Sequence, residues 1–394
     1  MISIKRESQS NILISLIVIS IITLHFSVTE IDGFPITFAV LFISLFFIKF
    51  YKLSFRIEGI FVLIIGLIIP IINLYTYNYM KMDIFSFMKT YSLWIVTLGA
   101  VTYCVYGKQK NMSIHSNFAK AIYISLLIIA SYSILQVLLY KLFNIDLLFN
   151  PFRKYQYLYQ NTTFKYSIRA QGFYLEPSFN ALIVDSLLVM LLFLKYKIRN
   201  SIIITIISMT VIKSLAGIIT LFIILFFYML SVKRVKIKTF LIIFEVLISL
   251  ILILNLNARL KELVTPGTSV YIRLILPIEL VRESISENFT GIAFGQMENI
   301  VKEYGYMNDF TMNKGIDNGL YFLIVYFGIW AISLSAFLLA RGFFSNNKKY
   351  QLLILYLFLI IQFSGGVFAP EFIYIICLVI YSYRISNGPL IYIN

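Results

Sequence analysis

The chain has 394 residues, of which 60% are hydrophobic, 17% aromatic and only 13% charged, and its formal net charge is +15. Soluble proteins average roughly 45 to 50% apolar residues, so this composition excludes an ordinary water-soluble globular protein. We expect an all-α polytopic integral membrane protein that forms a single transmembrane domain over residues 1–394.

Apolar runs long enough to cross a bilayer recur along the whole chain. A helix needs roughly 20 residues to span about 30 Å of hydrocarbon at about 1.5 Å per residue. On this basis we predict about twelve transmembrane helices. They cover residues 11–29, 34–51, 57–75, 84–106, 117–143, 177–196, 200–213, 215–231, 239–258, 316–340, 350–366 and 370–385.

The first apolar run follows Lys5 and Arg6, as the core of a signal peptide would. Residues 30–35 after it lack a small-x-small cleavage pattern, so we expect a retained helix. With Lys5 and Arg6 inside, most basic residues fall on cytoplasmic segments and most acidic residues fall outside. This is the positive-inside distribution, which places both termini in the cytoplasm and implies no nucleic-acid partner.

The spans 200–213 and 215–231 are short and meet at Lys213-Ser214. The first is too short to cross alone unless the bilayer thins. The alternatives are two full spans or a helical hairpin that stops short of the outer surface. Short or broken helices of this kind usually line a cavity, because freed backbone groups cannot face lipid.

Two external connections are long, residues 144–173 and 259–315, and we expect them to cover an active site. Disorder is the alternative for loops of this length. Within the second loop, Ser269 to Glu287 is apolar with scattered charges, and we predict a helix at the outer interface that Pro277 kinks.

The first long loop is basic, although it lies outside. Residues 167–180 are the densest polar segment of the chain and run directly into a predicted helix. Pro177 suits the first helical position, so Glu176 sits at or near the N-cap. One interpretation is a capping carboxylate beside a stabilising Arg169. The other is a functional pair, because an arginine fork suits phosphate oxygens.

Three further residues or segments have two interpretations each. Arg273, inside the apolar run 270–276, either snorkels to the headgroups or binds a lipid-linked phosphate. Asp185 lies about nine residues into its helix and is either functional or paired with a partner such as Lys213. The segment Gly291 to Gly295 lacks the strand context of a dinucleotide motif, and we interpret it as a turn.

Metal and thiol chemistry find no support in the sequence. Cys104 and Cys377 both fall inside predicted helices, and His25 and His115 fall on opposite sides of the membrane. We therefore predict no disulfide, no metal site and no histidine-based triad.

Four local features carry a resemblance to a known family. They are Arg169-x-x-Gly172-x-x-x-Glu176-Pro-Ser178, Lys213-Ser-Leu-Ala-Gly217, Arg273 followed by Gly291-Ile-Ala-Phe-Gly295, and Asp317-Asn318-Gly-Leu-Tyr321 ending in Phe327-Gly328. With these motifs in this order, the chain resembles the Wzy-type O-antigen and capsule repeat-unit polymerases, which belong to the same superfamily as the O-antigen ligases.

The resemblance implies a GT-C-like, metal-independent integral-membrane glycosyltransferase without a cofactor. Such an enzyme joins repeat units carried on undecaprenyl pyrophosphate into O-antigen or a related surface polysaccharide, at the outer face of the bacterial inner membrane. The implied partners are undecaprenyl-pyrophosphate-linked glycans, the lipid bilayer and a chain-length regulator.

Catalysis without a metal needs fixed cations near the leaving diphosphate and a base near the acceptor hydroxyl. For the catalytic roles we expect Arg169 and Arg273 as the cations and Glu176 as the base, with Asp317 in reserve. For substrate binding we expect Lys213, Ser214, Asn318 and Lys165.

Two other functions fit parts of the pattern. An O-antigen ligase of the same superfamily is disfavoured because neither long external loop contains a histidine. A lipid-linked oligosaccharide flippase would carry its unusual charges within helices near the midplane. Here those charges gather in the external loops.

Overall fold

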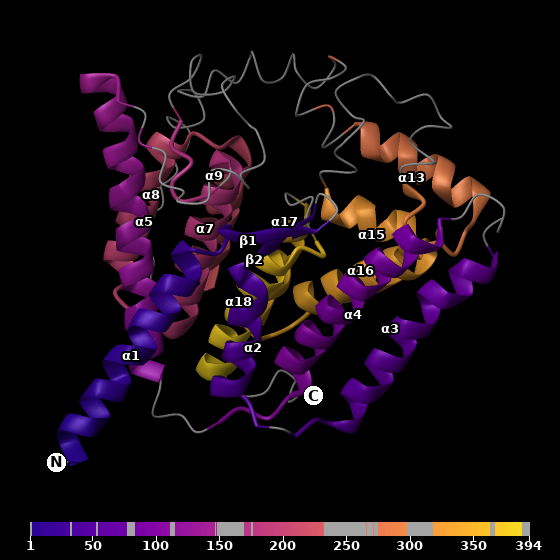
Figure 1. The fold of residues 1–394 in the computed structure, drawn as a ribbon, viewed down its shortest axis with the longest axis horizontal. Helices are drawn as coiled ribbons and strands as arrows, with labels where there is room; N and C mark the ends of the chain where they lie inside the picture. The colour runs from indigo at the N-terminus through magenta and orange to yellow at the C-terminus, as the bar shows by residue number, and fades with distance from the viewer. Residues whose placement is uncertain are drawn as a thin grey trace. The chain divides into compact units, whose positions relative to one another are not determined.

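The computed structural model describes residues 2–31, 34–52, 54–76, 83–110, 115–145, 147, 169–174, 176–231, 265, 271, 275–297, 318–362 and 367–387. Within these residues the fold is mainly helical (Figure 1). Four helices there are long and apolar enough to cross a membrane, at Ile57–Thr76, Ile84–Tyr106, Ser116–Phe143 and Pro177–Leu194. Shorter apolar helices accompany them, and the chain is a multi-pass membrane protein.

Each predicted span contains a helix except 239–258, which lies outside the described residues. The exact number of crossings stays a prediction. The helices are α1 (Ile2–Ile22), α2 (Phe38–Phe50), α3 (Ile57–Thr76), α4 (Ile84–Tyr106), α5 (His115–Phe143), α7 (Pro177–Leu194), α8 (Ile198–Ile212), α9 (Leu215–Ser231), α13 (Leu276–Glu287), α15 (Gly319–Phe327), α16 (Ile329–Phe343), α17 (Lys348–Gln362) and α18 (Pro370–Asn387).

The chain forms two compact units. The first combines Met1–Lys52, Gln109–Leu254 and Tyr374–Asn394, and the second combines Leu53–Lys108 with Asn255–Ile373. The expectation of one continuous transmembrane domain stays a prediction.

The first unit is a helix bundle built around α7. Helices α5, α8 and α9 pack against α7, and α1 packs against α5. Most of α7 is buried, including an uninterrupted run from residue 183 to residue 193. When a helix of a membrane protein is enclosed on all sides, its polar residues contact protein and not lipid.

The structure contains a short antiparallel hairpin that the hydropathy pattern did not predict. Strands β1 (Ser27–Ile31) and β2 (Phe34–Thr37) pair with each other where helices over 11–29 and 34–51 were expected. Val28, Thr29 and Ile31 are β-branched, which favours a strand. A window that sums hydrophobicity cannot separate such strands from the end of a helix.

In the second unit, α3 and α4 pack side by side, and a proline inside α3 explains one of their contacts (Figure 1). Pro70 has no N–H to donate to the carbonyl of Gly66, four residues earlier. The indole Nε1 of Trp94 on α4 donates to that carbonyl at 2.8 Å. The tyrosine hydroxyl of Tyr91 donates to the next carbonyl, that of Leu67, at 3.1 Å.

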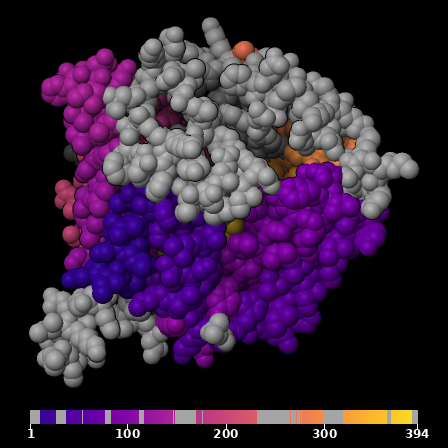
Figure 2. All heavy atoms as spheres, viewed as in Figure 1, coloured from indigo at the N-terminus to yellow at the C-terminus, as the bar shows by residue number. Residues whose placement is uncertain are grey.

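The remaining faces of α3 and α4 are apolar and exposed. Figure 2 shows their side chains in purple over a broad part of the face in view. The exposed residues of α3 include Ile60, Phe61, Ile64, Ile65 and Ile68. A helix pair with such a surface suits contact with lipid tails.

Two predictions about the second unit are corrected. The predicted span 316–340 is not one helix, because Gly328 (φ 50°, ψ −130°) separates α15 from α16. Only glycine adopts this backbone conformation readily. Pro277 lies in the first turn of α13 and not in its interior, and residues 272–274 before this helix lie outside the described residues.

Candidate active site

The six residues 169–174 form an anchored segment ahead of α7. The Ala170 N–H donates to the carbonyl of Val211 at 3.0 Å, which ties the segment to the last turn of α8. The Gly172 N–H donates to Gln136 Oε1 on α5 at 3.0 Å. The segment is therefore held by two different helices before the chain enters α7.

Asn180 completes this anchor from the first turn of α7. Its side-chain nitrogen donates to Ser133 Oγ on α5 at 2.9 Å and to the carbonyl of Ala170 at 3.4 Å, and the residue is fully buried. Gly172 has φ +64°, and a Cβ placed there would lie 2.8 Å from Asn180 Nδ2. The glycine is thus required both by its backbone conformation and by the close approach of the amide.

Glu176 is the N-cap residue of α7, and Pro177 occupies the first helical turn, as predicted. Its carboxylate accepts no capping hydrogen bond from the helix backbone. Instead Ser178 Oγ donates to Glu176 Oε2 at 2.9 Å. Since the side chain does not serve as a helix cap, the capping interpretation loses its main support.

Arg169 begins the anchored segment and Glu176 precedes α7, and both residues are partly exposed. The bond from Ala170 to Val211 brings Arg169 close to the junction between α8 and α9. That junction carries Lys213, whose φ of +53° ends α8. The backbones of Arg169 and Lys213 are therefore each within two residues of a hydrogen bond that joins the two segments.

Ser214 has a structural role at the same junction. It is 2% exposed, and its Oγ accepts a hydrogen bond from the Gly217 N–H at 3.4 Å, in the first turn of α9. The predicted break between spans 200–213 and 215–231 is confirmed by the end of α8 at Ile212 and the start of α9 at Leu215.

His25 is a residue of this region that the sequence did not single out. Its ring packs edge-on against Tyr174 and Phe179, at centroid distances of 5.4 and 4.9 Å. These residues lie on either side of Glu176 in the chain. Burial lowers the pKa of His25 from about 6.5 to about 4. The imidazole is therefore neutral at physiological pH.

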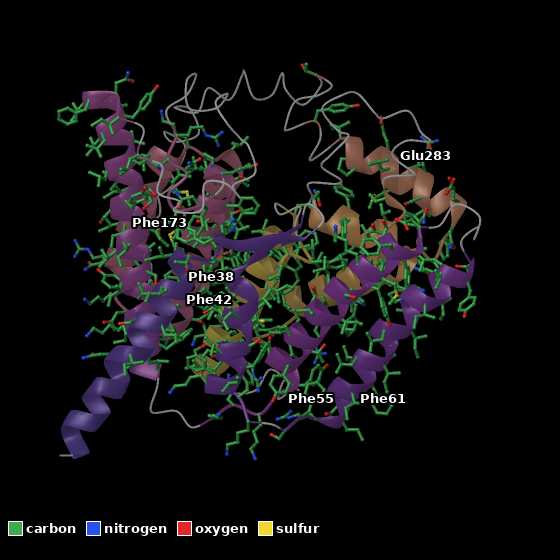
Figure 3. All side chains as sticks on the ribbon, in the orientation of Figure 1. Phe38, Phe42, Phe55, Phe61, Phe173 and Glu283 are labelled. Atoms are coloured by element: carbon green, nitrogen blue, oxygen red, sulfur yellow. The ribbon has the colours of Figure 1, made fainter. Side chains whose placement is uncertain are left out.

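Aromatic contacts also hold the anchored segment in place. Phe173, labelled in Figure 3, takes part in one of them. It stacks on Tyr132 of α5, with ring centroids 4.1 Å apart and planes inclined by 16°. The Tyr174 hydroxyl donates to the carbonyl of Ile21 at 3.1 Å, near the end of α1. Burial raises the pKa of Tyr174 well above its usual value, so this hydroxyl keeps its proton.

The second unit contains Asn318, another predicted site residue. Asn318 is fully buried as the N-cap of α15, where its Oδ1 accepts from the N–H groups of Leu320 and Tyr321 at 3.2 and 3.3 Å. The side-chain oxygen of Asn318, which we expected to bind a sugar, thus caps a helix. Lys165, Arg273 and Asp317 lie outside the described residues.

The glycines of the segment 291–295 allow close backbone contacts, as expected for a turn. A Cβ on Gly291 (φ +100°) would collide with the carbonyl of Tyr326, and one on Gly295 (φ +81°) would lie 2.6 Å from the backbone of Ser86. Asn73 Nδ2 of α3 reaches the same place and donates to the carbonyls of Thr290 and Tyr326 at 3.2 and 2.8 Å.

Asp185 is separate from this cluster. It is 1% exposed in the middle of α7, and neither carboxylate oxygen receives a hydrogen bond within the described part of the chain. The pairing with Lys213 considered from the sequence is therefore absent there. The described residues also contain no group of three or more histidine, cysteine, aspartate or glutamate side chains that could hold a metal ion.

Two comparisons with known proteins gave matches. The sequence model of a family described as WcaD colanic acid polymerase matches residues 12–385. A protein of Escherichia coli (strain K12) named "Putative colanic acid polymerase" is 33% identical over 129 residues, which are 31% of this chain and 32% of that protein. The aligned region thus spans about a third of the length of that relative.

Proposed function

Because this chain belongs to the WcaD colanic acid polymerase family, we propose that it polymerises lipid-linked oligosaccharide repeat units into a surface polysaccharide. The match over residues 12–385 is the observation that carries this proposal. We further propose that the carrier is undecaprenyl pyrophosphate and that the reaction takes place at the outer face of the inner membrane, with both termini cytoplasmic.

The reaction joins the anomeric carbon of a donor glycan to a hydroxyl oxygen of an acceptor glycan. The bond from that carbon to the lipid diphosphate breaks, and the diphosphate leaves with the electron pair. The acceptor hydroxyl loses its proton to a base. Nothing in this sequence of bond changes requires a redox cofactor, and the protein must supply a proton acceptor and positive charge.

Glu176 is our choice for the base. Its carboxylate is partly exposed at the start of α7 and is oriented by Ser178 rather than by the helix backbone. A carboxylate held in this way on a partly exposed residue can accept a proton from a sugar hydroxyl. Asp317, which lies outside the described residues, stays the reserve candidate.

Arg169 and Lys213 are our choice for the charges that stabilise the leaving diphosphate within the first unit. The bond between Ala170 and Val211 links the segment that carries Arg169 to α8, whose C-cap residue is Lys213. An arginine fork can contact two phosphate oxygens at once, and a lysine adds a point charge. Arg273 remains a proposed third cation, and Lys165 a proposed contact to the glycan.

Ser214 and Asn318 act through position in this proposal. Each supports the first turn of a helix, α9 for Ser214 and α15 for Asn318. The loss of either residue is expected to act through the helical turn that it supports. We also propose that catalysis depends on side chains and not on a metal. We propose a chain-length regulator as a partner.

Complementation of a deletion strain tests the function. A strain without this gene is expected to display single repeat units instead of long polymer, and the wild-type gene is expected to restore the polymer. Glu58→Gln, at an exposed glutamate in the first turn of α3, serves as the control for Glu176→Gln. Long polymer on the surface of the deletion strain would contradict the proposal.

A further inference from the structure

Three helices of the first unit meet at Gly217. A Cβ on Gly217 of α9 would overlap the Cβ of Ala181 on α7, and it would lie 3.4 Å from the sulfur of Met209 on α8. Gly217 and Ala181 are therefore level with each other, and Met209 reaches the same level with its side chain. They define the register in which α7, α8 and α9 pack.

One helical turn further into the bundle, this register brings two buried polar residues to the same depth. Residues four apart lie on the same face of a helix. Asp185 follows Ala181 by four residues, and Thr205 precedes Met209 by four on a helix that runs in the opposite direction. Asp185 is 1% exposed and Thr205 is fully buried, while α9 contributes the apolar Leu221 at this level.

Both residues lack hydrogen bonds within the described part of the chain. Neither oxygen of Asp185 has a partner, and neither does Thr205 Oγ1. Neighbouring hydroxyls behave differently: Ser201 donates to the carbonyl of Lys197 at 3.0 Å, and Ser208 donates to that of Ile204 at 2.8 Å. Thr205 does not make this local bond, although it lies on the same helix face.

The carboxylate also has no nearby positive charge on the helices that enclose it. The basic residues of α5 and α8 lie toward the helix ends, at Lys120, Lys141 and Arg199, and α9 has none. Lys213 follows Thr205 by eight residues, which is about 12 Å along a helix. An unpaired buried charge is too costly to persist in a membrane interior.

A bound species that neutralises Asp185 and also contacts Thr205 would satisfy both residues at once. A proton alone would neutralise Asp185 but would leave the hydroxyl of Thr205 without a partner. Water would supply hydrogen bonds but no charge. A small monovalent cation supplies both, because carboxylate and hydroxyl oxygens are its natural ligands and its single charge matches the single carboxylate.

We propose that Asp185 and Thr205 form a binding site for sodium between α7, α8 and α9. The carboxylate contributes two oxygen ligands and the hydroxyl contributes a third. The site lies about two helical turns below Pro177, inside the bundle that supports the proposed active site. The proposal is independent of the proposed catalytic roles, because it concerns the stability of the bundle.

Thermal unfolding of the purified full-length protein in lipid nanodiscs tests it. Sodium chloride replaces N-methylglucamine chloride at constant ionic strength, and the unfolding midpoint is recorded. For the wild type we expect a saturable rise of a few degrees. Asp185→Asn should show no dependence on sodium, whatever its basal stability.

Two further variants sharpen the test. Thr205→Val should raise the sodium concentration for half-saturation on the order of tenfold, because one ligand is lost. Ser208→Ala should respond as the wild type does, since the Ser208 hydroxyl is already bonded within its helix. An equal midpoint in both salts for the wild type, or the same sodium response in Asp185→Asn, would overturn the proposal.

Discussion

The side-chain amide of Asn180 occupies the space beside Gly172 that any Cβ at that position would need. The distance from such a Cβ to Asn180 Nδ2 would be 2.8 Å, and Gly172 has φ +64°. The two residues together fix the segment between Arg169 and Glu176. The proposed site therefore depends on a contact that contains neither of its charged residues.

Gly172→Ala tests this contact. The left-handed backbone and the collision with Asn180 should together destabilise the protein by about 1–3 kcal/mol. Surface polymer should fall by more than the loss of folded protein explains, because the segment is displaced. The measurements are thermal unfolding in nanodiscs and polymer length in complemented cells.

Gly99→Ala is the matched control, since a Cβ on Gly99 in α4 meets nothing within 4 Å. This change should be neutral or should stabilise by about 0.5–1 kcal/mol. Equal stability of both variants would show that the contact between Gly172 and Asn180 is unimportant.

Trp94→Phe removes the donor that compensates for Pro70. The carbonyl of Gly66 then has no partner in a region without water, at a cost of about 1–3 kcal/mol. Trp330 is the other tryptophan of the chain and is 54% exposed. Thermal unfolding should show a large loss for Trp94→Phe and almost none for Trp330→Phe. A similar loss in both would rule out the proposed role of the indole.

His25 gives the protein a predicted sensitivity to acid. The unfolded chain takes up a proton at this residue near its ordinary pKa of about 6.5, whereas burial lowers the folded pKa to about 4. The contribution of neutral His25 to the free energy of unfolding is fully present above pH 6.5. It decreases as the pH falls toward 4, by an amount on the order of 3 kcal/mol.

His25→Phe should therefore flatten this part of the stability curve while keeping the ring contacts with Tyr174 and Phe179. The measurement is the unfolding midpoint of both proteins at a series of pH values. Parallel curves for the wild type and the variant would contradict the prediction.

The start of α7 could be predicted from the sequence because its determinants are local. Glu176 and Pro177 mark a helix N-terminus by residue type alone. The break at Lys213 and Ser214 was also visible, because it interrupts an apolar run. Helices α4 and α9 have the same bounds as the predicted spans 84–106 and 215–231, because these bounds also follow from local apolar runs.

Contacts between residues far apart in the chain could not be predicted. Asn73 bonds to carbonyls more than 200 residues away, and Asn180 reaches Ser133 on another helix. No periodicity in the sequence encodes such partners. The packing of His25 against Tyr174 was missed for this reason, since it depends on the path of the chain after α1.

Glu176→Gln separates catalysis from helix capping. If Glu176 is the base, the glutamine variant should lose activity by about 100-fold or more. Its stability should change little, because the carboxylate makes no capping bond to α7. Arg169→Lys should also shorten the polymer, whereas Arg341→Lys, at the end of α16, should leave it unchanged.

The most direct measurement is polymerisation by the purified protein in nanodiscs, supplied with lipid-linked repeat units from cells that lack the gene. We predict a ladder of products from the wild type, release of the lipid diphosphate with each bond formed, and almost no ladder from Glu176→Gln. Folded wild-type protein that forms no ladder, or a Glu176→Gln variant that forms it at the wild-type rate, would contradict the account.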